Sequence, residues 1–111
     1  MPTSVRVLSP QTRDAALVLG QQIARARRAR GWTAEQLAER VGVSVRTMSN
    51  LERGSPSVAL GTAFEAATVL GIPLFGADGA ELARLVRQGQ DTLALLPSRV
   101  RRTNPLVRDD F

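Results

Sequence analysis

The sequence predicts an all-α protein of five helices, and three observations support this fold class. Residues typical of helix starts recur along the chain: Ser9 precedes Pro10, and Thr33 to Gln36 form a capping box. Apolar residues recur at helical spacing after each of these starts. Segments that alternate polar and apolar residues, as strands do, are scarce, and there is no internal repeat.

The first two predicted helices follow directly from their end signals. Ser9 caps the first, Asp14 lies near its positive end, and Gly31 stops it. The capping box at Thr33 starts the second helix, which ends at Gly42. The residues expected to face inward are Leu19, Ile23, Ala26, Leu37, Ala38 and Val41.

Three further helices are predicted by the same reasoning. Ser44 caps a helix that ends at Gly54, a fourth helix spans residues 58–70, and a fifth spans residues 80–96 with Gly89 weakening its middle. Met48 and Leu51 are expected to face inward from the third helix, and the buried side of the fourth is expected to hold Leu60, Ala63, Phe64, Ala67 and Leu70. The apolar residues of the fifth are Leu82, Leu85, Val86, Leu93 and Leu96. From Pro97 onward periodicity is absent, which predicts a flexible tail.

The second and third helices are short and joined by only a few residues. Helices of this length do not stand alone, so the two must pack closely. Ala38 is small where they would meet, Gly42 permits the sharp turn, and Val43 would fill the corner. With Met48 and Leu51 inward, the other side of the third helix displays a methyl group, guanidinium groups and an amide, which suit thymine, guanine and adenine. These outward residues are Val45, Arg46, Ser49, Asn50 and Arg53.

Composition excludes most enzyme chemistry. The 111 residues carry a net charge of +5, and all 15 cationic side chains are arginine. Histidine, cysteine, lysine and tyrosine are absent, which removes the usual metal ligands, catalytic triads and Schiff-base residues. We therefore expect a protein that is not an enzyme and needs no cofactor. The basic balance fits a polyanionic partner, although arginine standing in for lysine under a GC-rich coding bias explains it equally well.

The chain is expected to be cytoplasmic and nucleoid-associated. It has no cysteine for disulfides, and its first residues lack the apolar core of a signal peptide. Residues 58–77 carry one charge and resemble a membrane span in length, but Glu65 is central and Gly71 and Pro73 interrupt the run. We expect a buried helix there and no membrane contact.

Charge and composition divide the chain into four parts. Residues 1–31 hold six arginines and one aspartate, residues 32–96 sum to about −2, and the last fifteen residues hold four arginines and two aspartates. We expect an N-terminal extension at 1–12, the main domain at 13–76, an additional helix at 77–96 and a basic tail at 97–111. The arginines of the tail, Arg99, Arg101 and Arg102 among them, serve as solubilising charge, a phosphate-binding arm or a partner contact.

Residues 19–73 resemble the lambda-repressor-like, or XRE, helix-turn-helix family. The joint match is specific and comprises Arg27, Gly31 to Thr33, Leu37, Ala38, Gly42 to Ser44, Met48, Ser49 and Leu51 to Gly54. The resemblance implies a five-helix DNA-binding domain that binds double-stranded operator DNA, with residues 44–53 as the recognition helix in the major groove. The implied DNA-binding residues are Thr33, Ser44, Val45, Arg46, Thr47, Ser49, Asn50 and Arg53.

The same resemblance implies a structural ion pair between Arg27 and Glu52 that ties the first helix to the third. Ala34 departs from the family pattern, which has a phosphate-contacting Gln at this position. That contact is then either lost or supplied by Arg46, Arg53 or the arginines before Gly31. Trp32 is expected to pack beneath the start of the second helix, and Phe64 and Phe75 to be core or dimer residues. Arg25, Arg28 and Arg30 are either a solvated helix face or phosphate contacts.

A second resemblance concerns the fifth helix, the segment LLPSRVRR and the terminal DDF, which look like antitoxins of the HipB type. Proteins of that type form homodimers, repress their own operon and bind a HipA-type kinase toxin. The resemblance implies a toxin–antitoxin role, and the alternative is a stand-alone transcriptional regulator with no toxin partner. The fifth helix and residues 72–75 are the expected dimer surface, and the tail is the expected partner element.

Overall fold

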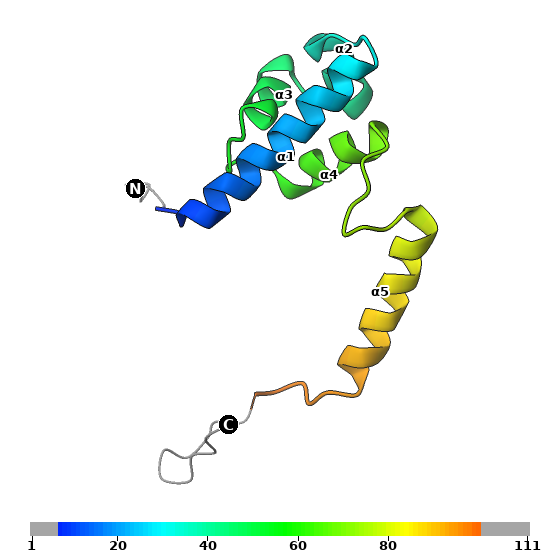
Figure 1. Cartoon of the computed structure of the whole chain (residues 1–111). Helices are drawn as coiled ribbons and strands as arrows, with labels where there is room; N and C mark the ends of the chain where they lie inside the picture. The colour runs from blue at the N-terminus through cyan, green and yellow to red at the C-terminus, as the bar shows by residue number, and fades with distance from the viewer. Residues whose placement is uncertain (1–6, 101–111) are drawn as a thin grey trace. The chain divides into compact units, whose positions relative to one another are not determined.

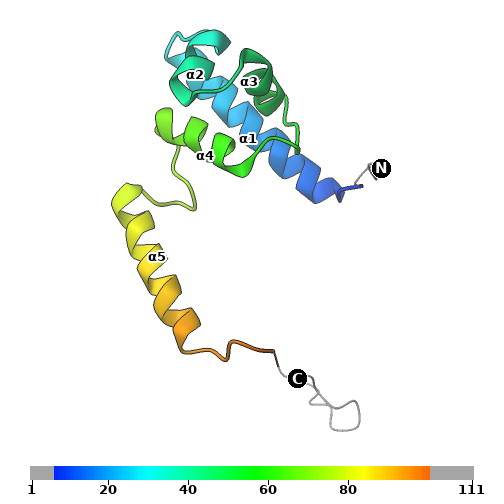
Figure 2. The ribbon, with the colours of Figure 1, turned by 180° about the vertical axis from the view of Figure 1, so that it is seen from behind.

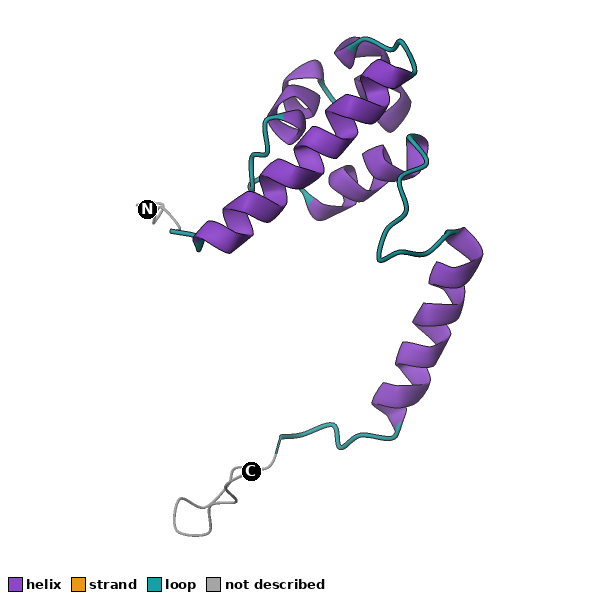
Figure 3. Ribbon diagram, viewed as in Figure 1, coloured by secondary structure: helices purple, strands orange, loops and turns teal. Residues whose placement is uncertain are grey.

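The computed structural model describes residues 7–100 and contains five helices in that range. They are α1 (Pro10–Ala29), α2 (Ala34–Val41), α3 (Val45–Glu52), α4 (Leu60–Val69) and α5 (Gly79–Ala94). Figure 3 draws helices and loops, and no strand, in the described residues. The prediction of an all-α protein of five helices is thereby confirmed for the part of the chain that the structure describes.

Two compact units make up the chain, with a boundary after Gly76. In the first unit, α2, α3 and α4 gather around the long helix α1 (Figures 1 and 2). Helix α3 packs against both α1 and α2, and α4 packs against α2. The second unit contains α5 and the tail, whose residues 101–111 lie outside the described part of the chain, as does the expected N-terminal extension up to residue 6.

Side-chain caps start α1, α2 and α5, and the first two of these caps are predicted from the sequence. The Ser9 hydroxyl accepts a hydrogen bond from the Thr12 amide at 3.3 Å, with Pro10 at the first helical position. Thr33 and Gln36 form the reciprocal capping box of α2. A further capping box, from Asp78 to Glu81, starts α5 one residue before the expected position. These caps satisfy amide groups that have no partner inside their own helix.

The core of the first unit is small, and all four of its helices contribute to it. Ile23, Leu37 and Met48 are the largest fully buried side chains. Around them lie Leu51, Ala38, Ala63, Ala66 and Leu70, with partly buried apolar residues such as Trp32, Val43 and Ile72 packed against the cluster. Burying such side chains is the main stabilising contribution to a unit of this size.

Two expected boundaries and one expected core residue are wrong. Helix α4 begins at Leu60 rather than at residue 58, and its N-cap residue Ala59 has no side chain that can cap it. Leu60 is 69% exposed because it lies in the first turn of α4, where no other helix covers it. Helix α5 ends at Ala94 rather than at residue 96, since Pro97 disfavours helical backbone in the residue before it.

One contact that the sequence analysis did not anticipate fixes how α1 crosses α3. Gly20 is buried, and a Cβ atom added to it would lie 2.5 Å from the carbonyl oxygen of Leu51 and 2.7 Å from that of Glu52. Only glycine allows the two backbones to approach so closely. The position of α3, which carries the expected site, therefore depends on having glycine, which has no side chain, at position 20 of α1.

Candidate nucleic-acid interface

The turn between α2 and α3 holds the two short helices at a fixed angle. Gly42 has φ = 86°, which lies in the left-handed region that favours glycine. The amides of Gly42 and Val43 both donate to the carbonyl of Ala38, at 2.8 and 3.0 Å. Val43 then packs against the core, as expected for the residue at the corner. This turn determines which side of α3 faces solvent.

Helix α3 begins at a well-formed cap. The Ser44 hydroxyl accepts a hydrogen bond from the Thr47 amide at 3.0 Å and donates one to the Thr47 hydroxyl, also at 3.0 Å. Both hydroxyl groups are therefore committed to the helix start in the free protein. A phosphate group approaching this end of α3 would meet them together with the first amides of the helix.

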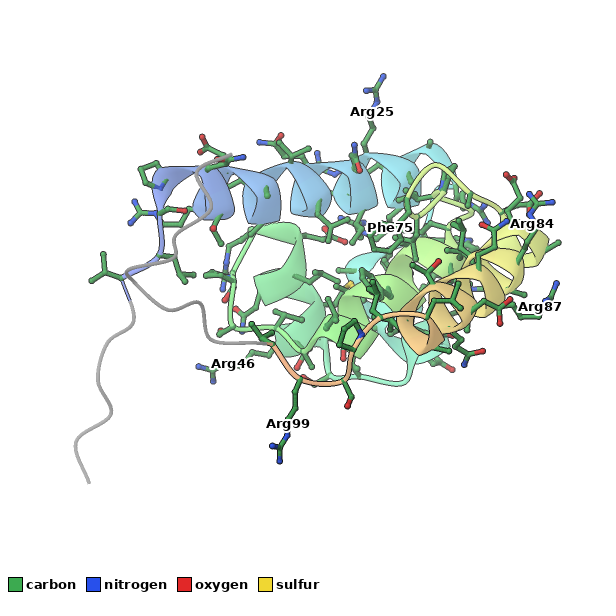
Figure 4. The ribbon with its side chains drawn as sticks, turned by 90° about the horizontal axis from the view of Figure 1, so that it is seen from below. Arg25, Arg46, Phe75, Arg84, Arg87 and Arg99 are labelled. Carbon is green, nitrogen blue, oxygen red and sulfur yellow. The ribbon has the colours of Figure 1, made fainter. Side chains whose placement is uncertain are left out.

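The two sides of α3 differ sharply in chemistry. Met48 and Leu51 are buried, whereas Val45 is 43% exposed and Arg46 and Arg53 are exposed. Figure 4 shows the Arg46 side chain extending away from the body of the domain. The remaining polar residues of the expected site are half-buried: Thr47, Ser49 and Asn50. The structure therefore brings the α3 residues of the expected site together on one accessible surface.

Asn50 and Arg53 are linked to each other on this surface. The Arg53 guanidinium donates a hydrogen bond to Oδ1 of Asn50, three residues earlier on the same helix. The main-chain carbonyl of Asn50 accepts the Ser55 amide at 2.9 Å. Bidentate recognition of adenine needs both the oxygen and the nitrogen of an Asn side chain. Asn50 can read adenine in that way only if the Arg53 guanidinium moves away, or if Oδ1 of Asn50 accepts hydrogen bonds from Arg53 and adenine together.

A hollow of about 350 Å³ lies beside α3 and extends the surface beyond the helix. Its lining combines α3, the loop that follows it and the first turns of α4: Val43, Thr47, Asn50, Ser57, Val58, Ala59 and Thr62. The sequence analysis did not select Ser57 and Thr62. The run from Ser55 to Ser57 directly after the recognition helix is the signal that could have found the first of them.

Thr33 is the exposed N-cap residue of α2 and lies apart from the α3 residues in sequence. Its hydroxyl accepts the Gln36 amide at 3.1 Å, and the Gln36 side-chain oxygen accepts the Thr33 amide at 2.8 Å. Gln36 is thus occupied with capping. It does not replace the phosphate-contacting Gln that the family pattern places where this chain has Ala34.

Arg27 and Glu52 join α1 to α3 through two hydrogen bonds. Arg27 Nε lies 2.6 Å from Glu52 Oε2, and Arg27 Nη2 lies 2.9 Å from Oε1. A third donor of the same guanidinium bonds the main-chain oxygen of Trp32 at 2.8 Å. Each side chain is 11% exposed. The hydrogen bonds that Arg27 donates to Glu52 raise the pKa of Arg27, burial opposes this, and the carboxylate charge reinforces it.

The arginines near Trp32 make contacts within the domain. Trp32 packs against the core, as predicted, and the guanidiniums of Arg30 and Arg40 lie 5.1 and 4.1 Å from its ring centre. Arg30 also donates to the carbonyl of Leu70 at 2.9 Å. Figure 4 shows Arg25 pointing from α1 to the side opposite Arg46. The arginines on the α3 surface itself are therefore Arg46 and Arg53.

Phe75 is not a core residue of the described chain. It is 78% exposed and has φ = 55°, an unusual value for a bulky side chain. Its ring meets that of half-buried Phe64 edge-on, with ring centres 6.0 Å apart. Phe64 is therefore partly a core residue and Phe75 is not one. The alternative expectation, that these aromatic residues lie in a dimer contact, stays a prediction.

Residues 23–76 match the model of a family described as helix-turn-helix. A search of curated proteins and a search of solved structures returned no match. Residues 23–76 are therefore similar to a helix-turn-helix domain, and the match indicates a DNA-binding transcriptional regulator. The family is a regulatory one and is not typically enzymatic. Among the described residues, no helix is long and apolar enough to cross a membrane.

Proposed function

We propose that this chain is a sequence-specific transcriptional repressor that binds operator DNA as a homodimer. The observation that carries the proposal is the two-sided chemistry of α3: Met48 and Leu51 are buried, while Arg46, Asn50 and Arg53 lie on the accessible side. A helix of this kind fits the major groove, where base edges present distinct donors and acceptors. The matched helix-turn-helix segment supports the same assignment.

In this proposal the site residues have different roles. Arg46 and Val45, at the start of α3, read base edges, and the linked Asn50 and Arg53 act at its far end. Ser44, Thr47 and Ser49 contribute hydroxyl groups to phosphates or bases, as Thr33 does from the start of α2. Arg27 and Glu52 do not contact DNA. They hold α3 against α1 through their paired hydrogen bonds.

Selection of bound sites from random DNA tests the proposal. Two recognition helices related by a two-fold axis predict an inverted repeat with half-site centres about one helical turn, roughly 34 Å, apart. Recovery of a single unrepeated site would contradict the homodimer, and recovery of no preferred sequence would contradict specific recognition. The selected site then serves for all titrations described below.

The narrower proposal is that the regulator is the antitoxin of a HipA-like kinase toxin and represses its own operon. The resemblance of the fifth helix and the tail to HipB-type antitoxins supports it. Co-purification of the full chain with a kinase encoded beside it, and suppression of that kinase's toxicity in cells, is the test. If the neighbouring genes encode no kinase, the chain is a stand-alone regulator of the same DNA-binding type.

A further inference from the structure

Arg53 determines which way the side-chain amide of Asn50 faces. Its guanidinium forms a hydrogen bond with that amide, three residues earlier in the chain. A guanidinium carries five N–H donors and no acceptor, so its partner must be the amide oxygen, Oδ1. The amide nitrogen, Nδ2, therefore points away from this contact and has hydrogens left to donate. Asn50 thus presents a donor to a group that approaches α3.

The surroundings of the two side chains support this contact. Arg53 is the C-cap residue of α3, and residues three apart along a helix are neighbours on its surface. The main-chain carbonyl of Asn50 accepts the Ser55 amide at 2.9 Å, which fixes the backbone after the helix. Glu52, the nearest carboxylate along the chain, is bonded by Arg27 and does not compete for Arg53. Oδ1 of Asn50 is therefore occupied before DNA arrives.

The other polar groups on this side of α3 also act mainly as donors. Arg46 is exposed, and its guanidinium has no acceptor. Thr47 lines the same hollow as Asn50, and its hydroxyl oxygen accepts the Ser44 hydroxyl at 3.0 Å, which leaves its own hydrogen free to donate. The Ser49 hydroxyl can both donate and accept. With Oδ1 of Asn50 occupied, this surface is suited to acceptor atoms on the bases.

We propose that Asn50, held in this orientation by Arg53, reads acceptor atoms of guanine or thymine and does not read the amino group of adenine. The inference rests on the proposed function and specifies what the far end of α3 recognises. In the major groove guanine offers the acceptors O6 and N7, and thymine offers O4. The amino groups of adenine and cytosine would instead face Nδ2 of Asn50 as donor against donor. Asn50 touches the base, and Arg53 is a positioning residue that acts through it.

Adenine is the base that an asparagine commonly reads, and this recognition needs both polar atoms of the amide: Nδ2 donates to N7 and Oδ1 accepts from N6. A second donor arriving at Oδ1 of Asn50 also meets the positive charge of Arg53. If Arg53 is released instead, its guanidinium loses a partner beside a groove from which water is displaced, and an unmet donor is costly there. Guanine avoids both costs, because the same charge attracts its acceptors. An acceptor edge is therefore favoured at this position.

Base analogues test the assignment atom by atom with the full chain. Site selection with the wild type and with Asn50→Ala identifies the base pair that Asn50 contacts, because the substitution relaxes the preference there. If the pair is G·C, a guanine analogue lacking O6 or one lacking N7 should weaken the wild type about two- to tenfold more than Asn50→Ala. If the pair is T·A, a thymine analogue lacking O4 should do the same. Purine in place of the adenine, which removes the N6 amino group, should affect both proteins equally.

Substitutions at Arg53 test its positioning role. Arg53→Leu frees Oδ1 of Asn50, so the preference at the same base pair should shift toward adenine, and removal of the adenine N6 amino group should then weaken binding about two- to tenfold. Arg53→Lys keeps a charged donor and should keep the wild-type preference. Arg25→Leu, on the opposite side of the domain, is the matched control. If Arg53→Leu weakens all operators equally and leaves the base preference unchanged, Arg53 only contacts phosphate and the positioning role is wrong.

Asn50→Asp supplies the converse change. Its carboxylate keeps the bond to Arg53 but replaces the amino group with an oxygen, so the preference should move to a base that offers an amino group, cytosine or adenine. Circular dichroism checks that each variant keeps its helices. A wild type that depends on the adenine N6 amino group, an Asn50→Ala variant that relaxes no base pair, or an unchanged preference in Asn50→Asp would overturn the proposal. Any of these results with an inverted-repeat operator would leave the proposed function standing, whereas recovery of no preferred sequence would refute both.

Discussion

Arg46 is the residue whose environment fits base recognition best. It is exposed near the start of α3, extends away from the domain, and has no hydrogen-bond or ion-pair partner among the described residues. Arg53, by contrast, is already bound to Asn50. A free guanidinium can present two parallel donors to guanine, which gives it sequence information that a phosphate contact lacks.

Arg46→Ala is expected to weaken operator binding by about 1–3 kcal/mol and to relax the preference at one base pair. Titration of the selected operator and its single-base variants at constant salt measures both effects. Arg25→Ala, which removes an exposed arginine on the opposite side of the domain, is the matched control and should bind as the wild type does. If Arg46→Ala weakens every operator variant equally, Arg46 contacts phosphate and not a base.

The Arg27–Glu52 pair is expected to contribute to folding and not to recognition. Removing either partner leaves the other charge partly buried, which should cost at most the roughly 3–5 kcal/mol of a fully buried pair. Arg27→Ala and Glu52→Ala should each destabilise the fold, and the double variant should lose less than the sum. Urea melts followed by the fluorescence of Trp32, the only tryptophan, give all three values. Strict additivity would mean that the two side chains do not interact energetically.

The pH dependence of this contribution follows from the raised pKa of Arg27. A base whose pKa is higher in the folded state keeps its stabilising effect at every pH below its unfolded pKa, and loses it only as the pH rises through the folded value. The pKa of arginine in an unfolded chain already lies far above the mildly alkaline range. The arginine side of the pair should therefore contribute equally at neutral and mildly alkaline pH, and melts of Arg27→Ala and wild type should keep a constant difference there.

At the scale of helices, local signals predict the elements well. The Ser9 and Thr33 caps and the Gly42 turn depend on neighbouring residues, so the sequence alone locates α1, α2 and α3 to within a residue or two. Contacts between helices cannot be predicted from such local signals. The approach of Gly20 to the α3 backbone, the stacking of Arg40 on Trp32 and the exposure of Leu60 depend on how the helices cross, which no local pattern encodes.

In the site, too, some features follow from local sequence and others depend on how the chain folds. The outward side of α3 is predictable because Met48 and Leu51 fix the inward side by helical spacing. The hydrogen bond between Arg53 and Asn50 is not predictable from the sequence, since it depends on the side-chain conformations of both residues. The hollow that adds Ser57 and Thr62 is formed by segments brought together only in the folded domain.

Gly20→Ala should destabilise the domain, by about 1–3 kcal/mol, because its Cβ would overlap backbone atoms of α3 that cannot rotate away. The shift of α3 should also weaken operator binding. Gly61→Ala is the matched control: Gly61 lies in α4 and its added Cβ meets nothing within 4 Å. That variant should be as stable as wild type or up to about 1 kcal/mol more stable. Equal effects of the two substitutions would refute the close approach.

For the whole molecule, charge is concentrated at the two ends of the chain rather than spread evenly. The net charge of +5 arises from residues 1–31 and 97–111, while the centre is slightly acidic. Within the folded domain, Arg27 and Arg30 of that first segment are held by Glu52 and by the Leu70 carbonyl. These two arginines therefore stabilise the domain and are not available to DNA.

Operator affinity should fall linearly with salt concentration on logarithmic axes, and the slope counts the phosphates that arginines neutralise. Arg53→Gln should reduce the slope by about 1 per bound copy, because we expect its side chain to lie nearer the phosphates than the bases. Arg46→Ala should leave the slope nearly unchanged, since a base contact releases no condensed counterion. Deleting residues 98–111 should also leave it unchanged if α3 supplies the phosphate contacts. A smaller slope after that deletion would instead place the arginines of the tail, Arg99 among them, on the DNA backbone, and the tail would then act as a phosphate-binding arm.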